Sequence, residues 1–194
     1  MLTYVSFPVV ETVADFMREV YDKSIRSDPG ECFYAVIDKT HANGGERSTG
    51  KYAGIIALSA TSTTNTSTEL GALIFPDFHR THVASNAIGL LLLWTLDPPS
   101  RGGLGLRRVE WKCHAENLAS RRVAERMTFE FEGIARWQRV FPGGKVSLRI
   151  DELERRSGTT GEKPGRHTAM YSIVWDEWDD DKRAKVVAQM ERTR

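Results

Sequence analysis

Residues 110–133 decide the fold and read EWKCHAENLASRRVAERMTFEFEG. Apolar and charged side chains alternate up to Cys113, which predicts a strand. Asn117 can cap a helix expected over 118–127, and a second strand is expected over 129–140. The stretch therefore predicts a strand, a helix and a strand in close succession.

The same patterns predict elements on either side of this stretch. Helical spacing of apolar residues alternates with short apolar runs, and hairpins precede the strand–helix–strand crossovers. We therefore expect an α/β fold, in which a mixed sheet carries helices on both faces. The expected elements are a helix over 11–27, strands over 32–38, 51–60 and 69–75, a helix over 82–94, strands over 106–114 and 170–174, and a helix over 179–194.

Two polar stretches predict connections between these elements. Residues 61–68 are nearly all Ser, Thr and Asn, which predicts a loop, and 143–167 is charged and rich in glycine, which predicts a flexible insertion. A lid over a site and an ordinary disordered insertion are both open interpretations of the second stretch. The length fits a single domain over 1–178, followed by a C-terminal helix over 179–194.

The charges of the chain are balanced, with 27 basic and 26 acidic residues and a formal net charge of +1. A nucleic-acid reader usually carries a basic excess or a basic stripe, so no nucleic-acid partner is expected. The competing interpretation, a nucleic-acid binder, would rest on six arginines. These are Arg101, Arg107, Arg108, Arg121, Arg122 and Arg126.

No targeting segment or membrane span is expected. The N-terminus lacks a basic region followed by an apolar one, so no signal peptide is predicted. The most apolar stretch, 84–96, contains polar residues and is shorter than the ~20 residues that a membrane span needs. It is expected to form a core helix, and no membrane partner is expected.

The two cysteines, Cys32 and Cys113, both lie in strand-like apolar runs. They form no CxxC pair, and the histidines His114 and His167 share no ligand spacing with a carboxylate partner, so no metal is expected. Two free thiols are typical of a reducing compartment, and we therefore expect a cytoplasmic protein.

Residues 75–86 read FPDFHRTHVASN and place a basic turn between a strand and a helix. Backbone N–H groups at the start of a helix lack partners within the helix and attract anions, and Arg80 adds positive charge there. This turn can therefore hold a diphosphate. The alternative is an ordinary loop-to-helix junction with basic surface residues.

Together, these stretches resemble the GNAT superfamily of acetyltransferases, in the branch that includes ribosomal-protein N-terminal acetyltransferases. The resemblance covers residues 33–178, and several separated motifs agree in order and spacing. The matching positions are Glu69, Leu70, Gly71, Pro76, Asn117, Ser120, Arg121, Phe129, Glu132, Gly133, Tyr171, Ser172, Ile173, Glu177 and Trp178.

The resemblance implies a twisted mixed sheet whose central parallel strands splay apart, with the pantetheine arm of CoA in the gap. It implies an N-acetyltransferase that uses acetyl-CoA and no metal, with a small-molecule amine or a protein N-terminus as acceptor. The amine is expected to attack acetyl-CoA directly in a ternary complex. The expected contacts with acetyl-CoA are Ile74, Phe75, Arg80, Thr81, His82, Val83, Ala84, Ser85, Asn117, Ser120 and Arg121.

Amide formation needs a neutral amine, a polarised carbonyl and a proton for the leaving thiolate. Glu69 is the expected base, with Glu110 as a second candidate, and Ser120 and Tyr171 are candidates for protonating the thiolate. Alternatives stay open for each residue: a structural carboxylate at Glu69, a simple contact with CoA at Ser120, and a half-buried strand tyrosine at Tyr171.

Three features depart from the family pattern. His82 stands where the family has a glycine that lets the backbone approach phosphate, and Thr128 stands where it has a helix-ending glycine. Residues 4–8 resemble a segment that follows the family's first strand and helix, so the usual first strand is expected to be missing. A naturally short product, a truncated gene product and a second subunit, as in a homodimer, are open explanations.

The alternative function is a degenerate module that binds CoA weakly or not at all and acts as an interaction protein.

Overall fold

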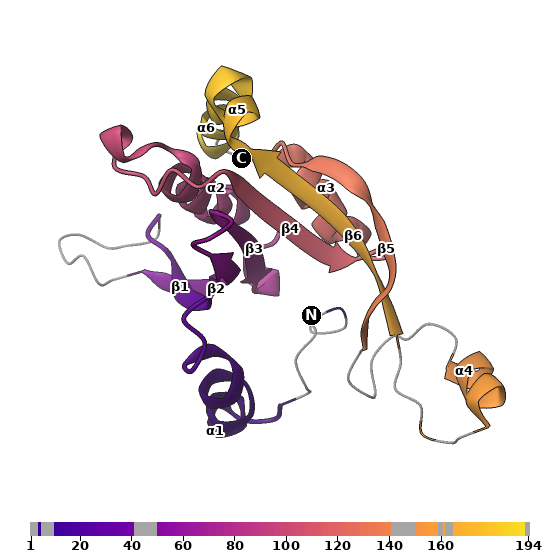
Figure 1. The fold of residues 1–194 in the computed structure, drawn as a ribbon. Helices are drawn as coiled ribbons and strands as arrows, with labels where there is room; N and C mark the ends of the chain where they lie inside the picture. The colour runs from indigo at the N-terminus through magenta and orange to yellow at the C-terminus, as the bar shows by residue number, and fades with distance from the viewer. Residues whose placement is uncertain are drawn as a thin grey trace.

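The structure is a computed structural model, and it describes most of the 194-residue chain. The described residues are 4, 10–40, 50–140, 150–158, 161 and 165–192. Six strands form one mixed sheet in the order β1-β2-β3-β4-β6-β5 (Figure 1). The strands are β1 Cys32–Asp38, β2 Lys51–Ser62, β3 Ser67–Ile74, β4 Arg108–His114, β5 Glu130–Val140 and β6 Gly165–Val174.

Within this sheet, β3 and β4 run parallel and the other neighbouring strands run antiparallel. Figure 1 shows α2 and α3 on the same face of the central strands. The α/β fold with a mixed sheet is thus confirmed. The helical segments are α1 Val13–Phe16, η2 Met17–Ile25, η3 Pro76–Phe78, α2 His82–Leu96, η4 Pro99–Arg101, α3 Leu118–Arg126, α4 Ile150–Ser157, α5 Trp175–Glu177, η5 Trp178–Lys182 and α6 Arg183–Met190.

The core lies between the central strands and α2. Leu70 on β3, Ile88 and Leu92 on α2, and Val109 on β4 are each at most 1% exposed. Burial of each such large side chain contributes roughly 1.5–3 kcal/mol relative to exposure. This packing fixes α2 against the central strands.

The predicted loop over 61–68 is wrong at both of its ends. β2 continues to Ser62 and β3 begins at Ser67, so a short turn joins the two strands. Thr61 and Thr68 share a cross-strand hydrogen bond between their hydroxyls, 2.8 Å apart. The polar composition suggested a loop, but β-branched threonine also fits a pleated strand well.

The stretch over 143–167 lies partly outside the described residues. Its described part contains α4, which the sequence pattern did not predict, and the first residues of β6, which begins at Gly165 instead of Met170. The segment 4–8 also lies outside the described residues, apart from Tyr4. Among the described residues ahead of α1, none lies in a strand.

Thr128 adopts the left-handed conformation expected of the glycine that it replaces, with φ 69°. Its N–H donates to the carbonyl of Glu125, and the N–H of Phe129 donates to the carbonyl of Ala124. A left-handed threonine costs roughly 1–2 kcal/mol, yet these bonds close the end of α3. Thr128 therefore makes the left-handed turn between α3 and β5 that was expected of a glycine.

Candidate functional site

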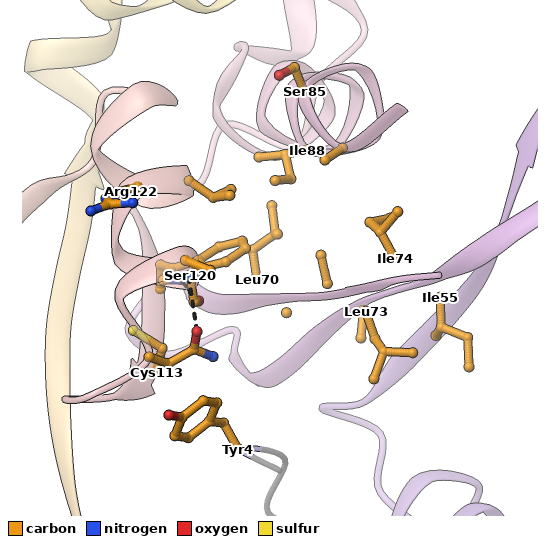
Figure 2. A pocket seen from close by; sticks show the side chains of 18 of the residues that line it. Tyr4, Ile55, Leu70, Leu73, Ile74, Ser85, Ile88, Cys113, Ser120 and Arg122 are labelled. Atoms are coloured by element: carbon orange, nitrogen blue, oxygen red, sulfur yellow. Dashed lines mark hydrogen bonds between the residues drawn. The ribbon is translucent and has the colours of Figure 1, made fainter. Parts of the chain in front are cut away.

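The parallel strands β3 and β4 separate soon after they begin. They pair only over Ser67–Glu69 and Arg108–Glu110, and beyond these residues they diverge toward their carboxyl ends (Figure 1). A cavity of ≈ 830 Å³ is lined by the separated parts of both strands and by the first turns of α2 and α3 (Figure 2). Gly71 borders this cavity, and a Cβ there would meet no atom within 4 Å.

The turn before α2 presents the start of a 15-residue helix to the cavity. Thr81 caps this helix, because its hydroxyl accepts from the N–H of Val83 at 3.3 Å and donates to the carbonyl of Phe78 at 2.7 Å. Arg80 is left-handed, with φ 61°. The amides of a first helical turn lack partners within the helix and attract anions, and the Arg80 guanidinium adds positive charge beside them.

His82 does not prevent this arrangement. Its Nε2 lies 3.5 Å from the carboxylate of Asp38, a buried residue at the end of β1. The imidazole is therefore directed toward β1, and the first turn of α2 still borders the cavity.

Asn117 and Ser120 lie on the opposite side of the cavity, at the start of α3. The side-chain oxygen of Asn117 caps the helix by accepting from the N–H of Ser120 at 3.1 Å. The Ser120 hydroxyl accepts from the indole of Trp111 at 3.0 Å. Figure 2 shows Ser120 beside Cys113, and burial raises the pKa of the Cys113 thiol. A thiol that is held protonated is a poor nucleophile.

Glu69 lies where β3 and β4 begin to separate, and it is ion-paired across the gap. The Nζ of Lys112 is 3.3 Å from Glu69 and 2.7 Å from Glu110. Burial opposes the charge on Lys112, but the two carboxylates outweigh burial and raise its pKa. Burial likewise opposes the charge on Glu110, but Lys112 and Arg108 outweigh it and lower that pKa. Of the two glutamates, Glu69 lines the cavity and Glu110 does not.

Neither Arg121 nor Tyr171 is among the described residues that line the cavity. The Nε of Arg121 donates to the hydroxyl of Tyr171 at 2.9 Å, and that hydroxyl donates to Glu125 at 3.1 Å. The guanidinium also stacks over Phe131. Tyr171 is 1% exposed, and its burial raises the pKa of its phenol.

The other residues that the sequence predicted as contacts with acetyl-CoA also fall into two groups, those that line the cavity and those that do not. Phe75 packs on Tyr52, and Val83 is buried in the core, so neither lines the cavity. The predicted residues that the structure brings together around the cavity are Glu69, Ile74, Arg80, Thr81, His82, Ala84, Ser85, Asn117 and Ser120.

Arg122 and Arg126 on α3 line the cavity, although the sequence motif did not single them out as contacts. Together with Ala119 and Val123, they follow the 3, 4 and 7 spacing of one helix face. This spacing could have identified Arg122 and Arg126 from the sequence, because it places Arg121 on a different face of the same helix.

The cavity is far more positive than the chain as a whole. Of the described residues that line it, Glu69 is the only carboxylate, whereas the chain has 27 basic and 26 acidic residues. Such a local excess favours anionic ligands. The lysine and arginines in the lining are Arg80, Lys112, Arg122, Arg126, Arg139, Arg166 and Arg192.

Within the described part of the chain, no three His, Cys, Asp or Glu side chains form a group that could hold a metal ion. No helix in that part is both long enough and apolar enough to cross a membrane.

The gap between β3 and β4 beside the start of α2 is the arrangement that the resemblance to acetyltransferases predicts. Residues 3–130 match the acetyltransferase (GNAT) domain, and the chain therefore belongs to the GNAT family. The family uses acetyl-CoA as the acyl donor, so this protein is an acyltransferase. The alternative of a degenerate interaction module is not favoured.

Solved structures agree with this assignment. The structure is similar to that of a GCN5-related N-acetyltransferase from Brucella melitensis, with 30% identity, a TM-score of 0.69 and coverage of 97% of this chain and 70% of that chain. It is also similar to spermidine N-acetyltransferase from Vibrio cholerae in complex with CoA and spermine, with 16% identity, a TM-score of 0.63 and coverage of 92% and 85%. The second likeness shows the fold alone. The comparison with curated proteins found no match.

Proposed function

We propose that this protein transfers the acetyl group of acetyl-CoA to a primary amine, which attacks the thioester directly in a ternary complex. The observation that carries the proposal is the gap between β3 and β4, which opens into a cavity with the first turn of α2 at its edge. An amine acceptor is also the substrate class of the spermidine N-acetyltransferase whose fold is similar. A small molecule and a protein N-terminus are both acceptors of this class.

The groups that line the cavity fit acetyl-CoA, which supplies the activated acyl group when it is bound. Beyond Glu69, no described residue pairs with the edge of β3 toward β4, and Gly71 leaves open space beside it. The start of α2 with Arg80 suits the diphosphate. Because Arg121 lies against Tyr171, we assign the phosphate contacts on α3 to Arg122 and Arg126.

We assign the two proton transfers of the reaction to two different residues. Glu69 accepts the proton of the amine, directly or through water, at the point where the strands part. Ser120 borders the cavity and is the proposed donor to the thiolate, whereas the Tyr171 hydroxyl already bonds Arg121 and Glu125. Cys113 has a raised pKa, which argues against an acyl-enzyme.

Binding and turnover test the proposal separately. Acetyl-CoA at about 100 times its dissociation constant should add about 2.7 kcal/mol to the free energy of unfolding, seen as a higher melting temperature. Amines added with acetyl-CoA should release free thiol. The absence of both effects at millimolar acetyl-CoA would contradict the proposal.

Asn117→Ala tests the position of the site. The variant loses the cap of α3 at the cavity, so we expect calorimetry to show weaker binding of acetyl-CoA. The matched control is Asn65→Ala, at an exposed turn between β2 and β3. Equal affinity in the two variants would contradict the placement of acetyl-CoA beside α3.

A further inference from the structure

The C-terminal helix α6 runs back along α2 and ends at the cavity. Its first residue, Arg183, binds Asp97, which caps the end of α2. Its last residue, Met190, lies against Gly89 in the middle of α2. The two helices are therefore antiparallel, and the chain beyond Met190 points toward the start of α2. Arg192, two residues further on, lines the cavity.

Arg192 is oriented by the last turn of α6. One N–H of its guanidinium donates to the side-chain oxygen of Gln189 at 3.3 Å, and Gln189 also lines the cavity. Among the described residues, no carboxylate pairs with this exposed guanidinium. A guanidinium has five N–H donors, so most of those on Arg192 are available to an anion.

Arg126, in the last turn of α3, lines the same cavity. It is exposed, and within the described part of the chain its side chain forms no hydrogen bond or ion pair. It follows Asn117, the cap of α3, by nine residues, which places it roughly 13 Å along the helix from that cap. We call Arg126 and Arg192 the outer arginines.

The outer arginines exceed what a diphosphate needs. The first turn of α2, together with Arg80, suits the diphosphate, and Arg122 adds a further charge on α3. Glu69 is the only carboxylate among the described residues that line the cavity, and it is already paired with Lys112. The charge of the outer arginines is therefore left for another anionic group.

CoA itself carries such a group. Besides its diphosphate it has a phosphate monoester on the 3′-oxygen of the ribose. Guanidinium groups bind phosphate through paired, charge-assisted hydrogen bonds. Two guanidinium groups that lack carboxylate partners suit a dianionic monoester better than they suit the adenine ring or the uncharged pantetheine arm.

We propose that the outer arginines bind the 3′-phosphate of CoA, so that the end of α6 forms part of the cofactor site. This inference rests on the proposed function and adds a determinant of cofactor specificity to it. Arg192 and Arg126 hold the phosphate from α6 and α3, on either side of it. The protein then distinguishes CoA from dephospho-CoA, which differs from CoA only by that phosphate.

Matched ligands test the phosphate. Calorimetry would titrate CoA against dephospho-CoA, and adenosine 3′,5′-bisphosphate against AMP, into the wild-type protein. The ligand with the 3′-phosphate should bind more tightly by about tenfold or more in each pair, the worth of a hydrogen bond to a charged group. Equal affinities for CoA and dephospho-CoA would overturn the proposal.

Variants of the outer arginines test the contact. Arg192→Ala and Arg126→Ala should each weaken CoA by about tenfold and leave dephospho-CoA unchanged, and Arg192→Lys should restore part of the loss. The control is Lys185→Ala, which removes one positive charge from an exposed position of α6 outside the cavity lining. It should change neither affinity. If Arg192→Ala weakened CoA and dephospho-CoA by the same factor, Arg192 would contact the diphosphate and the proposal would fail.

The bisphosphate separates this inference from the proposed function, because it has no thioester arm and its binding requires no chemistry. Tighter binding of the bisphosphate than of AMP, lost in both alanine variants, supports the inference even if no amine releases thiol. That result would remove the proposed function alone. Thiol release with equal kcat/KM for acetyl-CoA and acetyl-dephospho-CoA would keep the proposed function and overturn the inference. Absence of binding by both CoA and the bisphosphate would overturn both.

Discussion

The cavity has two walls of different chemistry. The helix wall, formed by the cavity-lining residues within 78–85 and 117–126, has basic side chains and a helix start but no carboxylate. The sheet wall, formed by Glu69, Lys112, Arg139 and Arg166, sets one carboxylate among three cations. In the function that we propose, the helix wall binds the phosphates of acetyl-CoA and the sheet wall provides the base.

The two walls also differ in what supports them. The sheet wall rests on strand pairing, whereas the helix wall is supported from behind by the packing of α6 on α2, where Met190 lies against Gly89. This packing is anchored by the buried Trp178, whose indole donates to Asp97 at 2.8 Å. The carboxylate of Asp97 also binds Arg183.

The largest expected effect comes from removing this support. Trp178→Ala should lower the free energy of unfolding by about 3–5 kcal/mol, because it leaves a cavity in the core and removes a buried hydrogen bond to Asp97. Trp175→Ala, three residues earlier and 55% exposed, is the control and should change it little. Chemical denaturation measures both. Similar losses in the two variants would show that the helix wall does not depend on this anchor.

The second-largest expected effect distinguishes the two glutamates that form ion pairs with Lys112. Glu69→Gln should lower kcat by roughly 100-fold or more, because an amide cannot accept the proton of the amine. Glu110→Gln removes a carboxylate that contacts the same Nζ but lies outside the cavity lining, so kcat should stay near that of the wild type. Steady-state kinetics with acetyl-CoA at saturation measures both. A larger loss in Glu110→Gln would transfer the role of base to Glu110.

The helix wall could largely be predicted from the sequence, because each half of it is a short continuous stretch. Thr81 and Asn117 act as helix caps, and caps are local features that a few neighbouring residues determine. The strands and helices around them were predicted for the same reason, since their apolar periodicity is local.

The sheet wall could be predicted only in part. Glu69 was identified from its place beside the expected gap, but Arg139 and Arg166 meet only through the register of β5 with β6. That register depends on the left-handed Trp137 and on the space that Gly165 leaves. Neither feature has a local sequence signal, because a left-handed tryptophan is unfavourable by itself and persists only when its surroundings enforce it.

The smallest expected effect distinguishes two neighbouring arginines of α3, only one of which belongs to the helix wall. Arg122 lines the cavity, whereas Arg121 bonds Tyr171 and stacks over Phe131. Arg122→Ala should therefore weaken acetyl-CoA binding about tenfold, the worth of one hydrogen bond to a charged group. Arg121→Ala should leave the dissociation constant unchanged and lower the melting temperature, because it removes contacts within the fold.

Calorimetry with acetyl-CoA and thermal melting without it measure these two outcomes independently. The pair of variants has the same change in charge and the same helix propensity, so a general electrostatic effect would weaken binding equally in both. Equal weakening would mean that the net charge of α3, and not the face on which an arginine lies, governs phosphate binding. A loss of affinity confined to Arg121→Ala would reverse the assignment and require Arg121 to leave Tyr171 when acetyl-CoA binds.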